Sequence, residues 1–138
     1  MDCLKYTFED FKNQINKTWI EFSAKSAIVR LNSDGYRTVL NFGQLLEMSE
    51  AFAKLMSNYG IDRAERIAVI SKYSAQAVVL NFMLAYSGYT AVLIDAALSA
   101  NERNRLLEFS DVSAVFTTQD IYDSISEEQI KNLPVFNI

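Results

Sequence analysis

The sequence predicts an α/β fold of three layers, in which helices flank a mostly parallel sheet, with an N-terminal helix and a β-hairpin in front of it. Two observations predict this architecture. Short apolar runs at 66–70, 91–94 and 113–117 have the continuous pattern of strands that are buried on both faces. Helical patterns separate these runs, and strands joined by a helical crossover lie parallel, with a right-handed connection. We therefore expect the three runs to form one parallel sheet with helices packed on it.

The stretch from 66 to 95 shows this pattern most clearly, as one strand–helix–strand unit. Ser74 follows the first strand and can cap a helix by accepting a hydrogen bond from a free backbone N–H. The helix of residues 75–87 carries almost only apolar side chains, so we expect it to be largely enclosed. Gly88 can take the left-handed turn that ends this helix. The second strand then stops at Asp95.

Apolar residues at spacings of three or four predict an amphipathic N-terminal helix that begins at Thr7. They are Phe8, Phe11, Ile15, Trp19 and Phe22. A helix on a membrane surface would need a basic polar face, and the polar face here is mixed, so docking against an apolar partner is favoured. Runs at 27–31 and 36–40 flank the segment 32–35, which contains an Asp-Gly step, and together they predict a β-hairpin.

Two capping boxes predict where the helices on either side of the central unit begin. The boxes and their helices are Asn41–Gln44 before 42–59, and Ser99–Glu102 before 99–110. A short helix is predicted around Ile121. Behind it the chain ends in 134–138, whose residues Pro-Val-Phe-Asn-Ile have the pattern of a strand that is just beginning.

This apolar ending differs from natural chain ends, which are usually polar and poorly ordered. We therefore expect residues 1–138 to be a fragment, cut near an internal boundary of a larger protein.

Composition excludes several classes of function. A net charge of −4 without any basic run argues against nucleic-acid binding. Histidine is absent, which removes the usual general base near neutral pH and the commonest metal ligand. The single cysteine, Cys3, stands at a terminus expected to fray and excludes an internal disulfide. The sequence has neither a signal-peptide pattern nor an apolar run of about 18 residues, so a cytoplasmic protein without a transmembrane segment is expected.

No motif supplies a complete catalytic site. The four glycines lie apart, so neither a phosphate-binding P-loop nor a dinucleotide fingerprint is present. Without histidine, a nucleophilic triad has no base. The pair Glu127–Glu128 could act in acid–base catalysis, but adjacent residues of a helix point apart, and a solvated surface is favoured.

Two positions follow the carboxyl ends of predicted parallel strands, where α/β proteins bind ligands. One is the segment 71–74, Ser-Lys-Tyr-Ser, in which Lys72 could hold an anion. The other is Asp95, which could bind a hydroxyl group or a ribose. The alternative, which we favour, makes Ser74 a helix cap, Lys72 a solvated charge and Asp95 a turn residue.

Four short motifs stand in order along the chain. They are Leu40–Leu45, Gly60–Ile70, Asn81–Asp95 and Leu98–Val112. Together they resemble the N-terminal part of the adenylate-forming (AMP-binding) enzymes, which include acyl-CoA ligases, also called acyl-CoA synthetases, and the adenylation domains of peptide synthetases. The resemblance covers about residues 27–118. Residues 1–138 would then form a single N-terminal subdomain, a fragment of such an enzyme.

Several residues depart from the family pattern. Leu93 stands where the family prefers proline, and Asp111 stands where a glycine is common. The other departures, all in place of prolines, are Lys72, Ala75, Ala96 and Ser99. These departures bear on which subfamily the chain resembles more than on its fold.

The resemblance implies a two-step reaction. A carboxylate attacks the α-phosphate of Mg-ATP to give an acyl-adenylate and pyrophosphate, and a thiol then takes the acyl group. ATP, Mg²⁺ and CoA are the implied cofactors of the full-length parent enzyme, and none is expected to be bound to this fragment. In such enzymes the phosphate loop, the Mg-binding Glu, the ribose-binding Asp and the catalytic Lys lie beyond this stretch. The resemblance therefore assigns no catalytic, cofactor-binding or metal-binding residue here.

The resemblance makes an acyl-CoA ligase fragment, inactive in isolation, the first expectation, with a carboxylic acid and the remainder of the parent enzyme as its partners. Two alternatives stay open. An amino-acid adenylation domain is slightly favoured by Ile94-Asp95, because CoA ligases more often carry Asn at the second position. A stand-alone binding module could have kept the fold and lost the chemistry.

A fragment would also expose surfaces that normally meet the rest of the enzyme, and exposed apolar patches drive association. The candidates are Val135, Phe136 and Ile138 at the chain end, and the side of the 75–86 helix that faces away from the sheet. We expect self-association through these residues.

Overall fold

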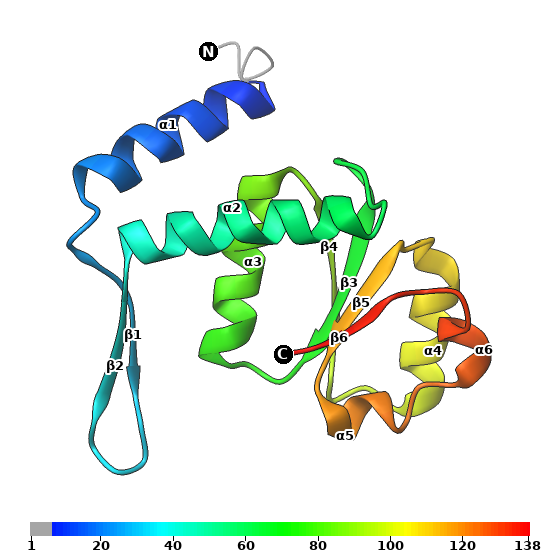
Figure 1. The fold of residues 1–138 in the computed structure, drawn as a ribbon. Coiled ribbons are helices and arrows are strands. Elements are labelled where there is room, and N and C mark those ends of the chain that lie inside the picture. The colour runs from blue at the N-terminus through cyan, green and yellow to red at the C-terminus, as the bar shows by residue number, and fades with distance from the viewer. Residues whose placement is uncertain (1–6) are drawn as a thin grey trace, which may run out of the picture.

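A computed structural model describes residues 7–138, so Cys3 and the expectation made for it lie outside the described residues. The helices are α1 (Phe8–Glu21), α2 (Phe42–Asn58), α3 (Ala75–Ser87), α4 (Ala100–Ser110), α5 (Gln119–Tyr122) and α6 (Glu127–Ile130). The strands are β1 (Ser26–Leu31), β2 (Arg37–Asn41), β3 (Arg66–Ser71), β4 (Thr90–Asp95), β5 (Ala114–Thr117) and β6 (Val135–Asn137). Helices lie on both sides of a central sheet, and the predicted α/β fold is confirmed (Figure 1).

The central sheet has the strand order β4-β3-β5-β6, and all neighbouring strands are parallel. The three predicted strands belong to it, and the predicted strand at the chain end is β6. From the central strand β3 the chain passes through α3 to β4 on one side. It then crosses back through α4 to β5 on the other side. The loops that follow β3 and β5 therefore lead to helices on opposite faces of the sheet.

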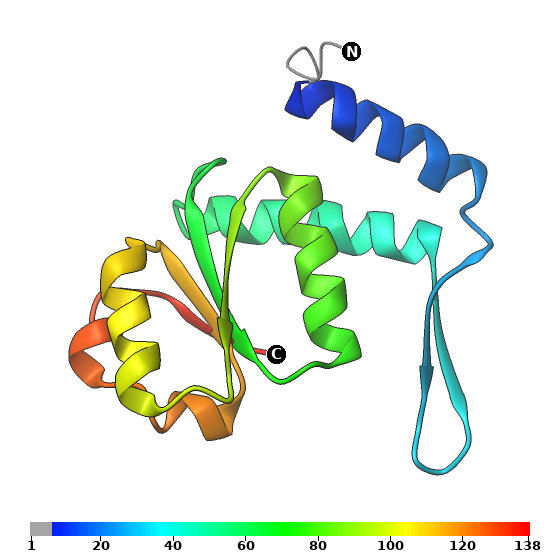
Figure 2. The same ribbon diagram turned by 180° about the vertical axis from the view of Figure 1, so that it is seen from behind.

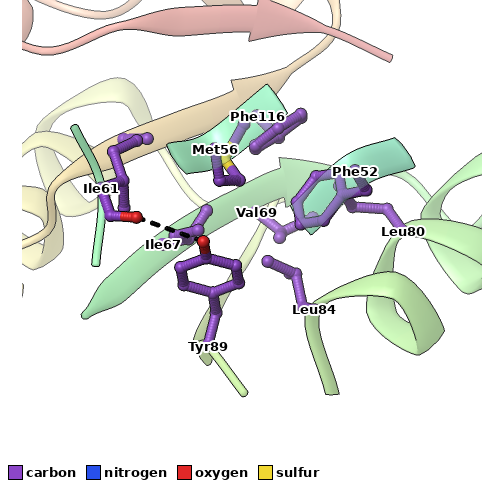
Figure 3. Packing of buried hydrophobic residues seen from close by; sticks show 10 residues of the cluster. Phe52, Met56, Ile61, Ile67, Val69, Leu80, Leu84, Tyr89 and Phe116 are labelled. Atoms are coloured by element: carbon purple, nitrogen blue, oxygen red, sulfur yellow. Dashed lines mark hydrogen bonds between the residues drawn. The ribbon is translucent and has the colours of Figure 1, made fainter. Parts of the chain in front are cut away.

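Two apolar clusters fill the space between the sheet and its helical layers. Because side chains alternate along a strand, Ile67 and Val69 of β3 point to the layer of α2 and α3. Ala68 and Ile70 point to the layer of α4, α5 and α6. Figure 3 shows the first cluster, in which Tyr89 also donates a hydrogen bond to the Ile61 carbonyl at 3.2 Å. Each helical layer is thus fixed by one face of the same central strand.

The predicted helix boundaries are confirmed by their caps. The side chain of Asn41 accepts from the Gln44 N–H at 2.8 Å, and that of Gln44 accepts from the Asn41 N–H at 3.0 Å. Ser99 and Glu102 form the same reciprocal pair before α4. At the end of α3, Gly88 adopts a left-handed φ of 83°, as a C-terminal glycine does.

α1 docks on the outer side of α2 and α3 through Trp19. The Trp19 ring stacks on Tyr86 of α3 with ring centroids 5.8 Å apart, and it also contacts Phe42 of α2. This confirms the docking role predicted for the N-terminal helix. It also corrects the expectation that the outer side of α3 is bare, because α1 covers Tyr86. Phe82, 44% exposed, is the large apolar residue of α3 that stays open to solvent.

The chain end is less exposed than expected. The Phe136 ring stacks on Phe116 of β5 at 4.7 Å and meets Tyr59 of α2 edge-on at 4.9 Å. Val135 and Ile138 are also partly buried against the core clusters. The expectation of a bare apolar surface at these three residues is therefore wrong.

A second correction concerns β4. The sequence predicts that residues 91–94 are buried on both faces, but of these only Ile94 is buried, and Leu93 is 65% exposed. The reason is position, because β4 is an edge strand with a neighbouring strand on one side only. The apolar run of an edge strand looks the same in the sequence as that of a central one.

The hairpin β1–β2 extends away from the sheet and its helices (Figures 1 and 2). Its turn is the predicted one, with the Asp34 carboxylate accepting from the Tyr36 N–H at 3.0 Å and Gly35 at a φ of 83°. Residues Leu31 and Tyr36 are largely exposed. Across residues 7–138, the helices are all too short or too polar to span a bilayer.

Candidate functional site

Ser71 ends β3, and residues 72–74 form the loop that links β3 to α3. The Ser74 hydroxyl accepts a hydrogen bond from the Ala77 N–H at 3.1 Å, and Ser74 is the N-cap of α3. This confirms the interpretation of Ser74 as a cap. Tyr73 is 95% exposed and packs on nothing.

Lys72 is solvated, with its side chain 79% exposed, and it also joins the loop after β3 to the start of α5. Its ammonium nitrogen lies 3.3 Å from a carboxylate oxygen of Asp120, the second residue of α5. The Thr118 hydroxyl donates to the other carboxylate oxygen. This hydroxyl, and to a smaller extent Lys72, hold the pKa of Asp120 below its ordinary value.

The pair lies where the strand order reverses, between the ends of β3 and β5, which is the usual ligand crevice of an open parallel sheet. Sequence reasoning named Lys72 but missed Thr118 and Asp120. The signal that could have found them is a polar pair placed directly after a buried strand.

Asp95 has the turn role that the sequence favoured. Its carboxylate accepts from the Ala97 N–H at 2.8 Å, which orders the turn between β4 and α4. The register of the sheet pairs Ser71 with Asp95, so the two predicted positions meet at one edge. Both lie in a groove of about 330 Å³ at the carboxyl ends of β3 and β4.

The groove also contains an unpaired polar atom. The side-chain oxygen of Asn81, on α3, is buried and has no hydrogen-bond partner within the described residues. Leu93 lies beside it in the same groove. A buried acceptor without a donor carries a desolvation cost, so this site lacks a polar partner.

A second, larger hollow is apolar. It measures about 480 Å³ and lies between the hairpin, α2, α3 and the chain end. Its lining includes Leu40, Phe52, Met83 and Ile138, with Arg30 and Thr38 at the hairpin. Surfaces of this kind commonly receive another apolar element.

Glu127 and Glu128 begin the short helix α6 and are both exposed. Their exposure favours the interpretation of a solvated surface. Arg103 is a buried polar residue that the sequence did not single out. Its guanidinium donates to the carbonyl oxygens of Ala96 and Leu98 and to the Ser124 hydroxyl, and so ties the turn after β4 to the segment behind α5.

Two observations bear on whether the described residues could hold a metal ion or an anion. Within 7–138, His, Cys, Asp and Glu side chains are nowhere gathered in a group of three that could hold a metal ion. The Lys72–Asp120 pair offers an anion one cation that is already neutralised. No step of nucleotide chemistry is therefore assigned to these residues.

Comparison with known proteins matches this chain to a family model and to proteins named as CoA ligases. The family model described as "AMP-binding enzyme" matches residues 16–136. The 2-succinylbenzoate–CoA ligase of Oceanobacillus iheyensis is 27% identical over 104 residues, which are 75% of this chain and 19% of that protein. A protein of the same name from Bacillus cereus strain AH820 is 26% identical over 98 residues, 71% of this chain and 19% of its own. The chain thus spans about a fifth of the length of these curated relatives.

Solved structures share the fold. A long-chain-fatty-acid–CoA ligase of Archaeoglobus fulgidus superposes on 98% of this chain and 28% of its own, with a TM-score of 0.78 and 20% identity. The N-terminal domain of FACL13 from Mycobacterium tuberculosis gives a TM-score of 0.75 with 18% identity, over 92% of this chain and 33% of its own. The peptide synthetase FmoA3 gives 0.74 with 15% identity, over 91% of this chain and 13% of its own. With the family model covering most of the chain, the protein belongs to the family of AMP-binding enzymes.

Proposed function

We propose that this chain is the N-terminal subdomain of an ATP-dependent acyl-CoA ligase and that it is inactive by itself. The observation that carries the proposal is the coverage of the relatives. Proteins named as CoA ligases match most of this chain, yet the chain spans only 19% of their length. In this proposal the rest of a longer protein supplies the catalytic groups.

The reaction proposed for the larger protein has two steps. A carboxylate oxygen of the acid attacks the α-phosphorus of Mg-ATP, an acyl–phosphate bond forms, and pyrophosphate leaves. The thiol of CoA then attacks the acyl carbon, AMP leaves, and the thiol proton is released. The product is a thioester, as in fatty acid metabolism, and a cytoplasmic location is part of the proposal.

The role of this chain in that reaction is structural. Its central sheet and two helical layers form a packed body, and polar side chains at the carboxyl edge fix the loops there. The apolar hollow beside α2 and α3 would receive an element from the rest of the protein. No described residue is proposed to contact the reacting atoms.

An amino-acid adenylation domain is the second candidate within the family. It is favoured by Asp95, because the resemblance places Asn there more often in CoA ligases. A non-catalytic binding module is the third candidate, and the lack of a metal-ligand group within 7–138 is compatible with it.

The test is an assay of the full-length protein that contains this chain. It is incubated with Mg-ATP and a panel of acids that includes 2-succinylbenzoate, fatty acids and amino acids, with and without CoA. We expect a CoA thioester to form from a non-amino acid. Pyrophosphate exchange that depends on an amino acid, without a CoA thioester, would support the adenylation domain. No turnover of ATP with any acid would support the binding module.

A further inference from the structure

β4 is an open edge of the sheet. Within residues 7–138 it pairs only with β3, so its other side has no neighbouring strand. Edge strands of natural proteins are usually protected by a proline, a bulge or a charged residue. β4 pairs with β3 in unbroken register, and Asp95 at its end is its one charged residue.

The backbone groups that point outwards follow from one hydrogen bond. The Thr90 N–H donates to the Glu65 carbonyl at 2.9 Å, on the side of β3. Residues of a strand in a parallel ladder alternate between the neighbour on one side and that on the other. Ala91, Leu93 and Asp95 therefore direct their N–H and C=O groups away from the sheet.

The side chains at this edge also lack a partner. Leu93 is 65% exposed, although Val69, its neighbour in register on β3, is buried at 4%. The Leu93 side chain therefore stays accessible to a further strand at this edge. The unpaired side-chain oxygen of Asn81 lies in the same groove as Leu93.

We propose that β4 pairs antiparallel with β4 of a second copy of this chain, about a two-fold axis at Leu93. The two sheets then become one continuous sheet, and both open edges are closed at once, as an isologous interface requires. The pairing places Leu93 against its equivalent and Ala91 opposite the Asp95 of the second copy. The two leucines cover each other, while the carboxylates, the one charge on each strand, are kept apart.

The second copy is favoured over an unrelated peptide because β4 is its own complement in this register. The edge at β6 is a poorer candidate, since β6 has only three residues and the Phe136 ring is already packed on Phe116. The inference concerns the chain of residues 1–138 and uses none of the observations that carry the function proposed above.

The test is sedimentation velocity over a rising concentration of the 138-residue chain. The unmodified chain should form a dimer. Leu93→Lys and Leu93→Glu should each abolish it, because like charges then face each other across the axis. An equimolar mixture of the two variants should restore a dimer, since residue 93 then pairs opposite charges. Recovery in the mixture tests the register itself and not merely the loss of a leucine.

Two controls keep the result decisive. Asn137→Lys changes an exposed residue on the opposite edge strand β6 and should leave the dimer intact. Leu93→Pro removes the outward N–H without adding charge and should also give a monomer, while circular dichroism checks that each variant is folded. A monomeric unmodified chain at every concentration, a dimer that survives in folded Leu93→Lys, or a mixture that stays monomeric would overturn the proposal.

Discussion

Lys72 and Asp120 are 48 residues apart in the sequence, yet their charged groups lie 3.3 Å from each other. Lys72 leaves the end of β3 towards one face of the sheet, and Asp120 follows β5 towards the other face. The contact therefore joins the loop after β3 to the start of α5, at the point where the strand order reverses. Both side chains are exposed, so the pair positions the loops more than it stabilises the fold.

Asp120→Asn should weaken the protein in a pH-dependent way. The folded state lowers the pKa of Asp120 below 3.8, so the stabilisation is complete above that value and is lost as the pH falls through the lower folded pKa. The urea midpoints of wild type and variant should differ at neutral pH and converge in acid. Thr118→Val, which removes the main cause of the lowered pKa, should reproduce most of this difference, and Lys72→Met the smaller part. A difference that is the same at every pH would contradict this assignment.

Trp19→Ala should detach α1 and lower the free energy of unfolding by roughly 3–5 kcal/mol, because a buried aromatic ring is lost. Trp19→Phe keeps an aromatic ring against Tyr86 and should cost clearly less. Trp19 is the one tryptophan in the sequence, so intrinsic fluorescence reports this contact directly. The native emission should be that of a buried indole, and an emission maximum typical of a solvated indole in the folded protein would refute the docking of α1.

Gly88→Ala should be destabilising for two reasons. The left-handed φ of 83° costs an L-residue about 1–2 kcal/mol. In addition, an added Cβ would lie 2.9 Å from the Phe8 ring, at the start of α1. Phe8→Ala in the same chain should recover the second part of the loss but not the first. Thermal unfolding of the two single variants and the double variant measures this, and strict additivity would show that the two residues do not touch.

Ala64→Gly should raise the free energy of unfolding by up to about 1 kcal/mol, because Ala64 adopts a left-handed φ of 69° that glycine takes without strain. The matched control is Ala53→Gly inside α2, where the same change should cost about 1 kcal/mol. Chemical denaturation of both variants measures the two changes in the free energy of unfolding. Equal destabilisation by the two changes would mean that residue 64 is not strained.

Much of this fold could be predicted because its signals are local. The capping box at Asn41 and the left-handed stop at Gly88 are written in neighbouring residues, and the structure confirms both. Asp111 is a related case, because it takes a left-handed φ of 47° at the position where the resemblance places glycine.

The features that could not be predicted from the sequence depend mainly on which strands are neighbours in the sheet. The exposure of Leu93 follows from β4 being at the edge, and the ion pair of Lys72 follows from β5 lying beside β3. The buried guanidinium of Arg103 donates mostly to backbone carbonyls, which leave no trace in the residue pattern. The candidate site was therefore predicted only in part, in Lys72 and Asp95, and without their neighbours.

Whether this chain is an inactive part of an acyl-CoA ligase is tested by comparing the full-length protein with the isolated 138-residue chain in one assay. Both are given Mg-ATP, CoA and the acid that the panel identifies, and the products are separated by chromatography. We expect acyl-CoA, AMP and pyrophosphate from the full-length protein and no product from the isolated chain. Acyl-adenylate or AMP formed by the isolated chain, or a full-length protein that releases ADP and phosphate instead, would contradict this expectation.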